Sequence, residues 1–380
     1  MGAVTRNFAN SITSTKTLDT GKNFKNLLIN GDMQIYQEAV DKTNVSTDTY
    51  RAGADRYMFR GNSVSAARFQ FSNEPIYTPW ENGFKNALYI QTTTAETTVA
   101  TSYIARVGQR IEGRMLQELA WGSGGAKPVT FSFWVRSSLT GTFACELWQR
   151  DVANGYASHN FTINSANTWE KKSVTFSANG DMPITHDTGN SLEVNIWLGA
   201  GTQFTTGTIS NGAWTTTEAD RAVGTTNNFI NTLNANMYLT GWQLEIGDKA
   251  TDFEFIPLDV NETRCMRYFE ILRGSDSYDT LLATWNRNTS DMGACLDYKV
   301  KKRAEPTVSF SNANTFRMNA ATGDITAASI SYSNPTVYTA QININASGTP
   351  LTAGQAGYIN MENGNGDAII KMDAELWLIQ

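Results

Sequence analysis

Histidine, the usual base that activates a serine or cysteine nucleophile, is scarce in this sequence. Its two histidines, His159 and His186, lie in the segments ASHN and ITHD, which have the composition of loops. A serine or cysteine nucleophile would need one of them as its base, and neither follows the strand–turn–helix pattern of a nucleophile elbow. The motifs GxSxG, HExxH, the phosphate-binding loop and the dinucleotide-binding loop do not occur. The sequence therefore predicts a protein that is not an enzyme, with no catalytic residue and no cofactor.

Metal binding is not predicted either. The sequence has three cysteines, Cys145, Cys265 and Cys295. Their spacing matches no zinc pattern and their odd number does not describe a disulfide framework, so reduced, mostly buried thiols are expected. The polar loops at 187–190, 245–248 and 363–367 offer oxygen ligands for Ca²⁺. None has the spacing of an EF-hand, and ordinary turn chemistry explains their composition.

Carboxylates are the one plentiful catalytic group, since 36 residues are Asp or Glu. Glycoside hydrolysis needs two of them held about 5–10 Å apart. Glu146 and Glu193, beside aromatic residues in strand-like segments, are the pair to consider. With so many acidic residues coincidental pairs are expected, and a surface or interface role is favoured for both glutamates.

Three tryptophans stand out by their position in alternating segments. In FSFWVRS, FACELWQR and SLEVNIWLG, the residues Trp134, Trp148 and Trp197 all fall on the polar side of the pattern. Their companions on that side include Arg136, Glu146, Glu193 and Asn195. A flat ring among hydrogen-bonding groups suits the face of a sugar, and these seven residues form the candidate glycan-binding set. The same pattern suits a subunit interface or a face covered by loops of the same chain, and such packing is the favoured use.

The elements that would position these residues are mostly strands. Alternation with a period of two, repeated in many segments without crossover helices, predicts an all-β fold with an antiparallel jelly-roll sandwich. Two segments have a helical spacing of apolar residues, 107–120 and 259–272. Strand-like alternation returns after residue 274 and predicts a second, smaller C-terminal β-sandwich domain. The last residues, DAELWLIQ, alternate as well, so truncation there is expected to be costly.

Composition limits the partners. The formal net charge is −6, which argues against a nucleic-acid-binding surface. No run approaches the ~20 apolar residues of a membrane span, and the N-terminus lacks the apolar core of a secretory signal. We therefore expect a protein made in the cytoplasm, without membrane insertion. Residues 1–23 are polar and rich in Ser, Thr and Asn, which predicts a disordered tail or an arm that orders against a neighbour.

Four segments resemble bacteriophage tail-fibre and related virion proteins that carry a carbohydrate-binding-module-like jelly roll. They are NLLINGDMQIYQ (26–37), ADRYMF (54–59), FSFWVRSSLTGTF (131–143) and a closing block from MYLTGWQLEIGDKATDFEFIP to RCMRYFE (237–270). The resemblance covers about residues 24–272 and is most specific in the closing block. It implies a jelly roll that ends at that block, a short helical run and a C-terminal β domain. It supplies no catalytic or sugar-contacting residue.

Together these features predict an N-terminal arm (1–23) that docks to the virion, a jelly-roll domain (24–258), a bridging helix (259–273) and a C-terminal β domain (274–380). The expected function is that of a non-enzymatic phage virion protein, a tail fibre or tail-associated component. It would bind a host-surface polysaccharide, contact other virion proteins and form a homo-oligomer, expected to be a trimer. Alternatives are a purely structural adaptor or head-decoration protein and, less favoured, a polysaccharide-cleaving tailspike.

Overall fold

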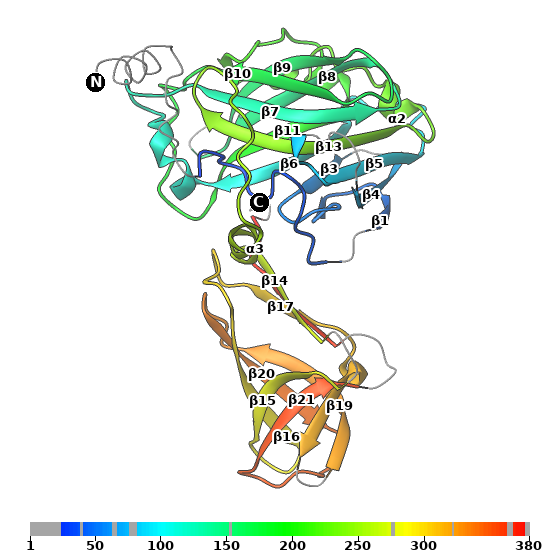
Figure 1. Ribbon diagram of the computed structural model, residues 1–380, viewed down its shortest axis with the longest axis vertical. Helices are drawn as coiled ribbons and strands as arrows, with labels where there is room; N and C mark the ends of the chain where they lie inside the picture. Colours follow the sequence, from blue (N-terminus) through cyan, green and yellow to red (C-terminus); the bar gives the residue numbers. More distant parts are fainter. Residues whose placement is uncertain are drawn as a thin grey trace, which may run out of the picture.

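The computed structural model describes residues 24–38, 41–62, 67–75, 82–151, 154–274, 278–320, 323–362 and 368–376. Figure 1 shows a large β-sandwich above, a smaller β unit below, and a short helix where they meet. The predicted all-β class is confirmed, and the strands pair antiparallel. The predicted N-terminal arm, the loop at 363–367 and the end of DAELWLIQ lie outside the described residues.

The sandwich consists of a six-stranded sheet, here called sheet A, and a seven-stranded sheet, here called sheet B. In spatial order sheet A contains β1 (Lys42–Val45), β4 (Arg68–Pro75), β5 (Asn86–Thr94), β13 (Asn236–Ile246), β7 (Val129–Ser137) and β10 (Glu170–Phe176). In spatial order sheet B contains β12 (Trp214–Thr215), β9 (Gly155–Ile163), β8 (Gly141–Gln149), β11 (Asn190–Ala200), β6 (Ile104–Glu112), β3 (Met58–Asn62) and β2 (Thr49–Tyr50). The connections carry the short helices η2 (Gly113–Met115), η3 (Gln117–Leu119), η4 (Thr202–Phe204), η5 (Glu218–Asp220) and α2 (Asn228–Asn231).

The core between the sheets is built by the apolar side of each alternating strand. In β7, Phe131, Phe133 and Val135 are fully buried there, as the alternation predicts. Trp242 of β13 packs edge-on against Phe131, with ring centroids 5.1 Å apart, and against Tyr57 at 5.2 Å. Full burial of each such side chain contributes roughly 1.5–3 kcal/mol. The apolar side of each strand is therefore fixed toward the opposite sheet.

The prediction of a helix at residues 107–120 is wrong. Residues 104–112 form β6, and only the short helices η2 and η3 follow. Every residue of β6 is buried because both faces of sheet B are covered at this strand. Ala105, Val107 and Ile111 face the core, and the polar Gln109 interrupts their alternation in the sequence. Gly113 ends the strand at a close approach of two segments, since a Cβ atom there would lie 2.0 Å from the backbone oxygen of Thr185.

The bridging segment is a helix for only part of its predicted length. Helix α3 (Leu258–Met266) is followed directly by the strand β14 (Phe269–Arg273). All five residues of β14 pair with β22 (Ile369–Asp373), whose other edge pairs with β17 (Thr307–Phe310). A strand partner more than 90 residues away in the sequence therefore overrides the local helical spacing.

The C-terminal unit differs in one respect from the predicted sandwich. Six of its strands close into a barrel, in the order β15 (Thr280–Asn286), β16 (Asp291–Asp297), β20 (Thr339–Ala346), β19 (Gly323–Ser333), β18 (Phe316–Ala320) and β21 (Ala356–Met361). The short helix η6 (Ala313–Thr315) precedes β18. Ile342 and Ile344 are buried inside, as their alternation predicts. Closure removes the unpaired edges that two small open sheets would expose.

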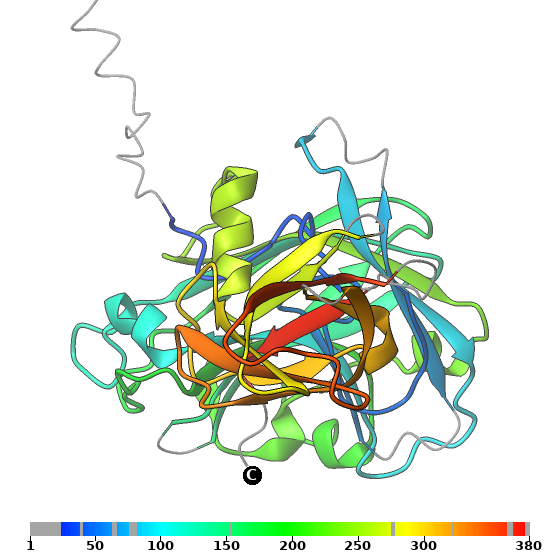
Figure 2. The ribbon, with the colours of Figure 1, turned by 90° about the horizontal axis from the view of Figure 1, so that it is seen from below.

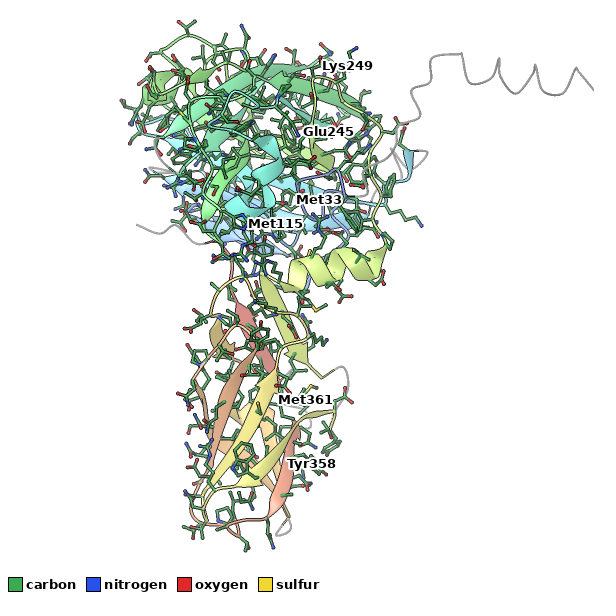
Figure 3. All side chains as sticks on the ribbon, turned by 90° about the vertical axis from the view of Figure 1, so that its left-hand side faces the viewer. Met33, Met115, Glu245, Lys249, Tyr358 and Met361 are labelled. Carbon is green, nitrogen blue, oxygen red and sulfur yellow. The ribbon has the colours of Figure 1, made fainter. Side chains whose placement is uncertain are left out.

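The barrel meets the sandwich along α3, β14 and β17. Figure 2, seen from below, shows the barrel in front of the sandwich with α3 at its side. In Figure 3, Tyr358 and Met361 mark the barrel, and Met115 marks the sandwich near α3. Apolar residues of α3 and the segment after it, Cys265 and Tyr268, pack in one buried cluster with Ile29, Ile35 and Leu376. The apolar side of the bridging segment is thus buried at this junction.

Ion pairs reinforce the junction. Arg56 of the sandwich pairs with Glu375, and both side chains are almost fully buried. Arg51 binds Glu38 at 2.8 Å and Asp373 at 3.1 Å, while Lys371 of β22 also reaches Glu38 at 2.5 Å. Residues between 38 and 56 and residues between 371 and 375 are therefore joined by charge as well as by apolar contact.

We expect the substitution Arg56→Met to lower the free energy of unfolding by about 3–5 kcal/mol, because it leaves the Glu375 carboxylate buried without a cation. Urea unfolding of the full chain measures this effect. Lys127→Met is the control, since Lys127 and its partner Glu118 are 43% and 47% exposed, and it should cost less than about 1 kcal/mol. A similar small loss for both variants would contradict the structural role given to Arg56.

Candidate functional site

The seven predicted glycan-binding residues do not form one face. Trp134 and Arg136 lie on β7 and therefore on the outer side of sheet A. The others lie on the outer side of sheet B, on β8 and β11: Glu146, Trp148, Glu193, Asn195 and Trp197. Alternation correctly predicts that these side chains point away from the apolar core. It does not reveal that β7 belongs to a different sheet from β8 and β11.

On sheet B, the two glutamates are buried in a network with arginines. Glu146 pairs with Arg106, and its two carboxylate oxygens accept hydrogen bonds from Arg221 at 2.9 Å. Asn195 donates to the same carboxylate at 3.2 Å. Both glutamate side chains and that of Arg106 are 0% exposed. These groups therefore hold one another within the fold.

Glu193 completes the network. Its oxygens lie 2.9 Å from Arg110 Nε, 3.3 Å from Arg106 Nη2 and 3.6 Å from Arg150 Nη1. Burial by itself would raise the pKa of Glu193, but the three guanidinium groups outweigh it and lower the pKa to about 2. A general acid in glycoside hydrolysis needs a raised pKa. Glu193 is therefore unsuited to that role.

The tryptophans of sheet B are already engaged. Trp197 is 0% exposed and packs against Phe204 of η4, with ring centroids 5.4 Å apart. Trp148 is half-buried, and its Nε1 donates to Asn154 Oδ1 at 3.1 Å. Arg150 and Arg221 lie 4.0 and 4.3 Å from the centroid of the Trp148 ring. The predicted stacking of a sugar is thus blocked at Trp197 by burial and opposed at Trp148 by guanidinium contacts, so packing within the chain describes this side better.

A small opening remains between the network and the loops that cover it. We call this opening, of about 180 Å³, the arginine pocket. It is lined by Arg60, Arg106, Arg221 and Trp148, among others. The charged groups that line its wall come from β3, β6 and the η5 region, and β8 contributes Trp148.

On sheet A, the outer face carries aromatic residues that the sequence reasoning missed. Tyr89 of β5 lies directly opposite Tyr238 of β13, and Tyr238 lies opposite Arg136 of β7. The ring centroids of Tyr89 and Tyr238 are 4.9 Å apart, and the guanidinium of Arg136 lies 5.2 Å from the Tyr238 ring. Trp169 lies just before β10, and its ring centroid is 6.2 Å from that of Tyr238. We call these four residues the aromatic row.

All four members of the aromatic row are half-buried, so part of each side chain is accessible. Arg136 is held by a hydrogen bond of 3.0 Å from its Nε to the backbone oxygen of Asn167. Trp134 faces the same side and packs beside Phe84. The signal for Tyr89 and Tyr238 was present in the sequence. Tyr89 in ALYIQ and Tyr238 in NMYLT each stand between two apolar residues, as Trp134 does in FSFWVRS. The same period of two therefore places them on the outer side of their strands.

The histidines and cysteines behave as expected in most respects. Cys145 and Cys265 are buried, Cys295 is exposed, and all three are free, which confirms the prediction of reduced and mostly buried thiols. His186 is exposed, whereas His159 lies within β9 instead of the expected loop. Across the ranges that the structure describes, no three His, Cys, Asp or Glu residues are arranged to hold a metal ion. Nor is any helix in those ranges long and apolar enough to cross a membrane.

Comparisons with known proteins give only distant likenesses. No family model and no curated protein matches the sequence. The enzymatically active domain of the bacteriophage CBA120 tailspike protein 4 is 10% identical, with a TM-score of 0.28, over 59% of this chain and 22% of that chain. TmCBM61 in complex with β-1,4-galactotriose is 8% identical, with a TM-score of 0.28, over 58% of this chain and 99% of that one. The family 11 carbohydrate-binding module of a Clostridium thermocellum cellulase is 9% identical, with a TM-score of 0.27, over 54% of this chain and 98% of that one.

This chain thus spans less than a quarter of the tailspike chain that it matches. The β-sandwich described above rests on the strands of the protein itself, and likenesses at this level assign it no ligand or partner.

The substitution Glu193→Gln should lower the free energy of unfolding by about 3–5 kcal/mol at pH 7, because it removes a buried carboxylate from three arginines. The folded-state pKa of Glu193, about 2, is below its ordinary value of 4.5. Its stabilising effect is therefore present above pH 4.5 and is lost as the pH falls toward 2. The difference between wild type and variant, measured by urea unfolding, should shrink over that range. A difference that stays constant on acidification would contradict the network.

Proposed function

We propose that this protein is a non-enzymatic component of a phage virion, a tail fibre or tail-associated protein, and that it binds a host-surface glycan. The observation that carries the glycan-binding part is the aromatic row on the outer face of sheet A. The resemblance of residues 24–272 to tail-fibre proteins supports the virion part. Assembly as a homo-oligomer and docking through residues 1–23 belong to the same proposal.

The aromatic row has the chemistry that sugar binding requires. Half-buried rings on a rigid sheet offer apolar surface for the C–H face of a pyranose at little cost in side-chain entropy. The row crosses from β5 over β13 to β7, and neighbouring strands lie about 4.8 Å apart. A sugar chain lying across the strands can therefore contact Tyr89, Tyr238 and Trp169 in turn. Arg136 supplies hydrogen-bond donors beside the rings.

A structural adaptor or head-decoration protein is the second candidate. Tyr, Trp and Arg are enriched at subunit interfaces, so the aromatic row would also suit contact with another copy of the chain. Phe255, on the same side of the sandwich beside Phe84, is 48% exposed and would extend such a surface. The polysaccharide-cleaving alternative loses support from Glu146 and Glu193, since arginines engage both carboxylates.

Binding of the full chain to host cells or to a glycan array tests the proposal. We expect Tyr238→Ala and Trp169→Ala each to weaken binding at least about tenfold, because each removes a ring on which the sugar stacks. Trp285→Ala on the barrel is the matched control, since Trp285 is 45% exposed and lies outside the row. Light scattering reports the oligomeric state of each variant.

Three results are distinguishable. Weaker glycan binding with an unchanged oligomer supports the proposal. A wild-type protein that binds no glycan, together with loss of the oligomer in the row variants, supports the structural alternative. Glycan binding that is unchanged in both row variants would contradict the assignment of the site.

A further inference from the structure

Another opening lies where helix α3 meets the sandwich. We call this opening, of about 370 Å³, the junction pocket. One wall belongs to α3 and the residues that follow it, and the facing wall belongs to the segment before β1, to β6 and to η2. In Figure 3, Met115 of η2 lies on the sandwich close to α3. No described residue lines both the junction pocket and the arginine pocket, and no member of the aromatic row lines it.

The lining of the junction pocket is mostly aliphatic. Both walls contribute such side chains, which are Leu27, Ile29, Ile111, Met115 and Val260. Phe24 and Tyr268 add two aromatic rings. Met115 is 43% exposed and therefore lies at the rim. A lining of this kind favours an apolar chain, since burying each methylene group contributes about fourfold in affinity.

Four arginines also line the junction pocket, and no described Asp or Glu does. Three of the four pair with buried carboxylates, namely Arg56 with Glu375, Arg110 with Glu193 and Arg267 with Glu112. The fourth, Arg264 of α3, forms no ion pair with any residue that the structure describes. Arg264 is therefore the cation of this lining that has no counter-charge of its own.

The guanidinium of Arg264 can be reached from the opening. Arg264 is half-buried, and of its three side-chain nitrogens only Nη1 is buried without a hydrogen-bond partner. Its Nε and Nη2 atoms therefore remain open to a ligand. These two atoms carry the parallel N–H groups that bind a carboxylate with two hydrogen bonds.

The surroundings of Arg264 favour an added anion. Burial lowers the pKa of Arg264, and the charge of Arg56 lowers it further, while Glu254 opposes both effects. The Glu254 carboxylate is itself engaged, because it accepts hydrogen bonds from the backbone N–H groups of Phe24 at 2.6 Å and Asn26 at 2.9 Å. The Phe24 ring lies 5.9 Å from the guanidinium. A ligand carboxylate at Arg264 would thus supply the missing counter-charge.

Size and polarity restrict the ligand. A volume of about 370 Å³ is near the lower end of the roughly 300–1,000 Å³ of small-molecule sites, which suits a short chain. The two polar neutral side chains of the lining are engaged: Asn26 donates to the backbone oxygen of Trp242 at 2.9 Å, and Gln109 exchanges two hydrogen bonds of 2.8 Å with the backbone of Ile29. The hydroxyl groups of a sugar would therefore lack partners here, whereas one anionic head group on an apolar chain is matched.

We propose that the junction pocket binds a medium-chain aliphatic carboxylate. The hydrocarbon chain lies against Leu27, Ile111 and Val260, and the carboxylate accepts hydrogen bonds from Nε and Nη2 of Arg264. The proposal does not rest on glycan binding by the aromatic row. It gives the protein a second ligand class, an apolar anion, at the junction of its two β units.

Calorimetric titration of the full chain at pH 7 with octanoate, butanoate and octanol tests this inference. Octanoate is ionised at this pH, and we expect it to bind saturably. Butanoate has half of the chain and should bind at least about tenfold more weakly. Octanol has the chain without the charge, and it should also bind at least about tenfold more weakly.

The variant Arg264→Gln should weaken octanoate binding at least about tenfold and leave octanol binding unchanged, because it removes the charge and keeps the aliphatic lining. Arg287→Gln is the matched control. Arg287 is half-buried just after β15, and its guanidinium lies 5.8 Å from the Trp285 ring, close to the 5.9 Å between Arg264 and Phe24. Urea unfolding shows whether each variant is folded.

Met115→Glu, at the exposed rim, is the second variant should Arg264→Gln not fold. Its negative charge should weaken binding of octanoate more than binding of octanol. Octanoate binding that is weakened in Arg264→Gln and unchanged in Arg287→Gln supports the inference. No saturable binding of octanoate by the wild-type protein, equal affinity for octanol, or unchanged octanoate affinity in both pocket variants would each overturn it. Glycan binding is measured separately with Tyr238→Ala, so failure of one site does not decide the other.

Discussion

The structure depends on a buried layer of paired charges that closes the outer face of sheet B. From the loop that carries η5, Arg221 binds Glu146, and Arg106 connects Glu146 to Glu193. Arg110 then joins Glu193 to the backbone oxygen of Leu376 at the C-terminal end of the described chain. One continuous set of charges thus fixes a covering loop, the sheet and the segment that follows β22.

This layer explains why sheet B is covered on both sides. Guanidinium and carboxylate groups can be buried only when they pair, and removing one member leaves the others uncompensated. Each residue of the layer is therefore constrained by several others. What remains accessible there is the arginine pocket, where cations exceed anions. On the outer face of sheet A, the rings of the aromatic row are only half-buried and remain partly accessible.

Much of this could be predicted from the sequence, for a clear physical reason. A strand with one buried face shows its period directly, so β7, β8 and β11 and the direction of Trp134, Trp148 and Trp197 follow from the residues alone. Three features could not be read in this way. In strand β6 the polar Gln109 interrupts the alternation of the core-facing residues. Strand β14 is fixed by its distant partner β22, and barrel closure depends on which strand ends meet. Trp134 lies on sheet A and Trp197 on sheet B. This difference likewise depends on pairing between segments that are distant in the sequence.

Hydroxyl-radical footprinting of the full chain, with and without host-surface polysaccharide, tests the central claim that the outer face of sheet A holds the glycan. Bound polysaccharide should reduce labelling of Tyr89, Tyr238 and Trp169, while Trp285 on the barrel stays labelled and the buried Trp197 stays unlabelled throughout. Labelling of the three row residues that does not change when the polysaccharide is bound would contradict the claim.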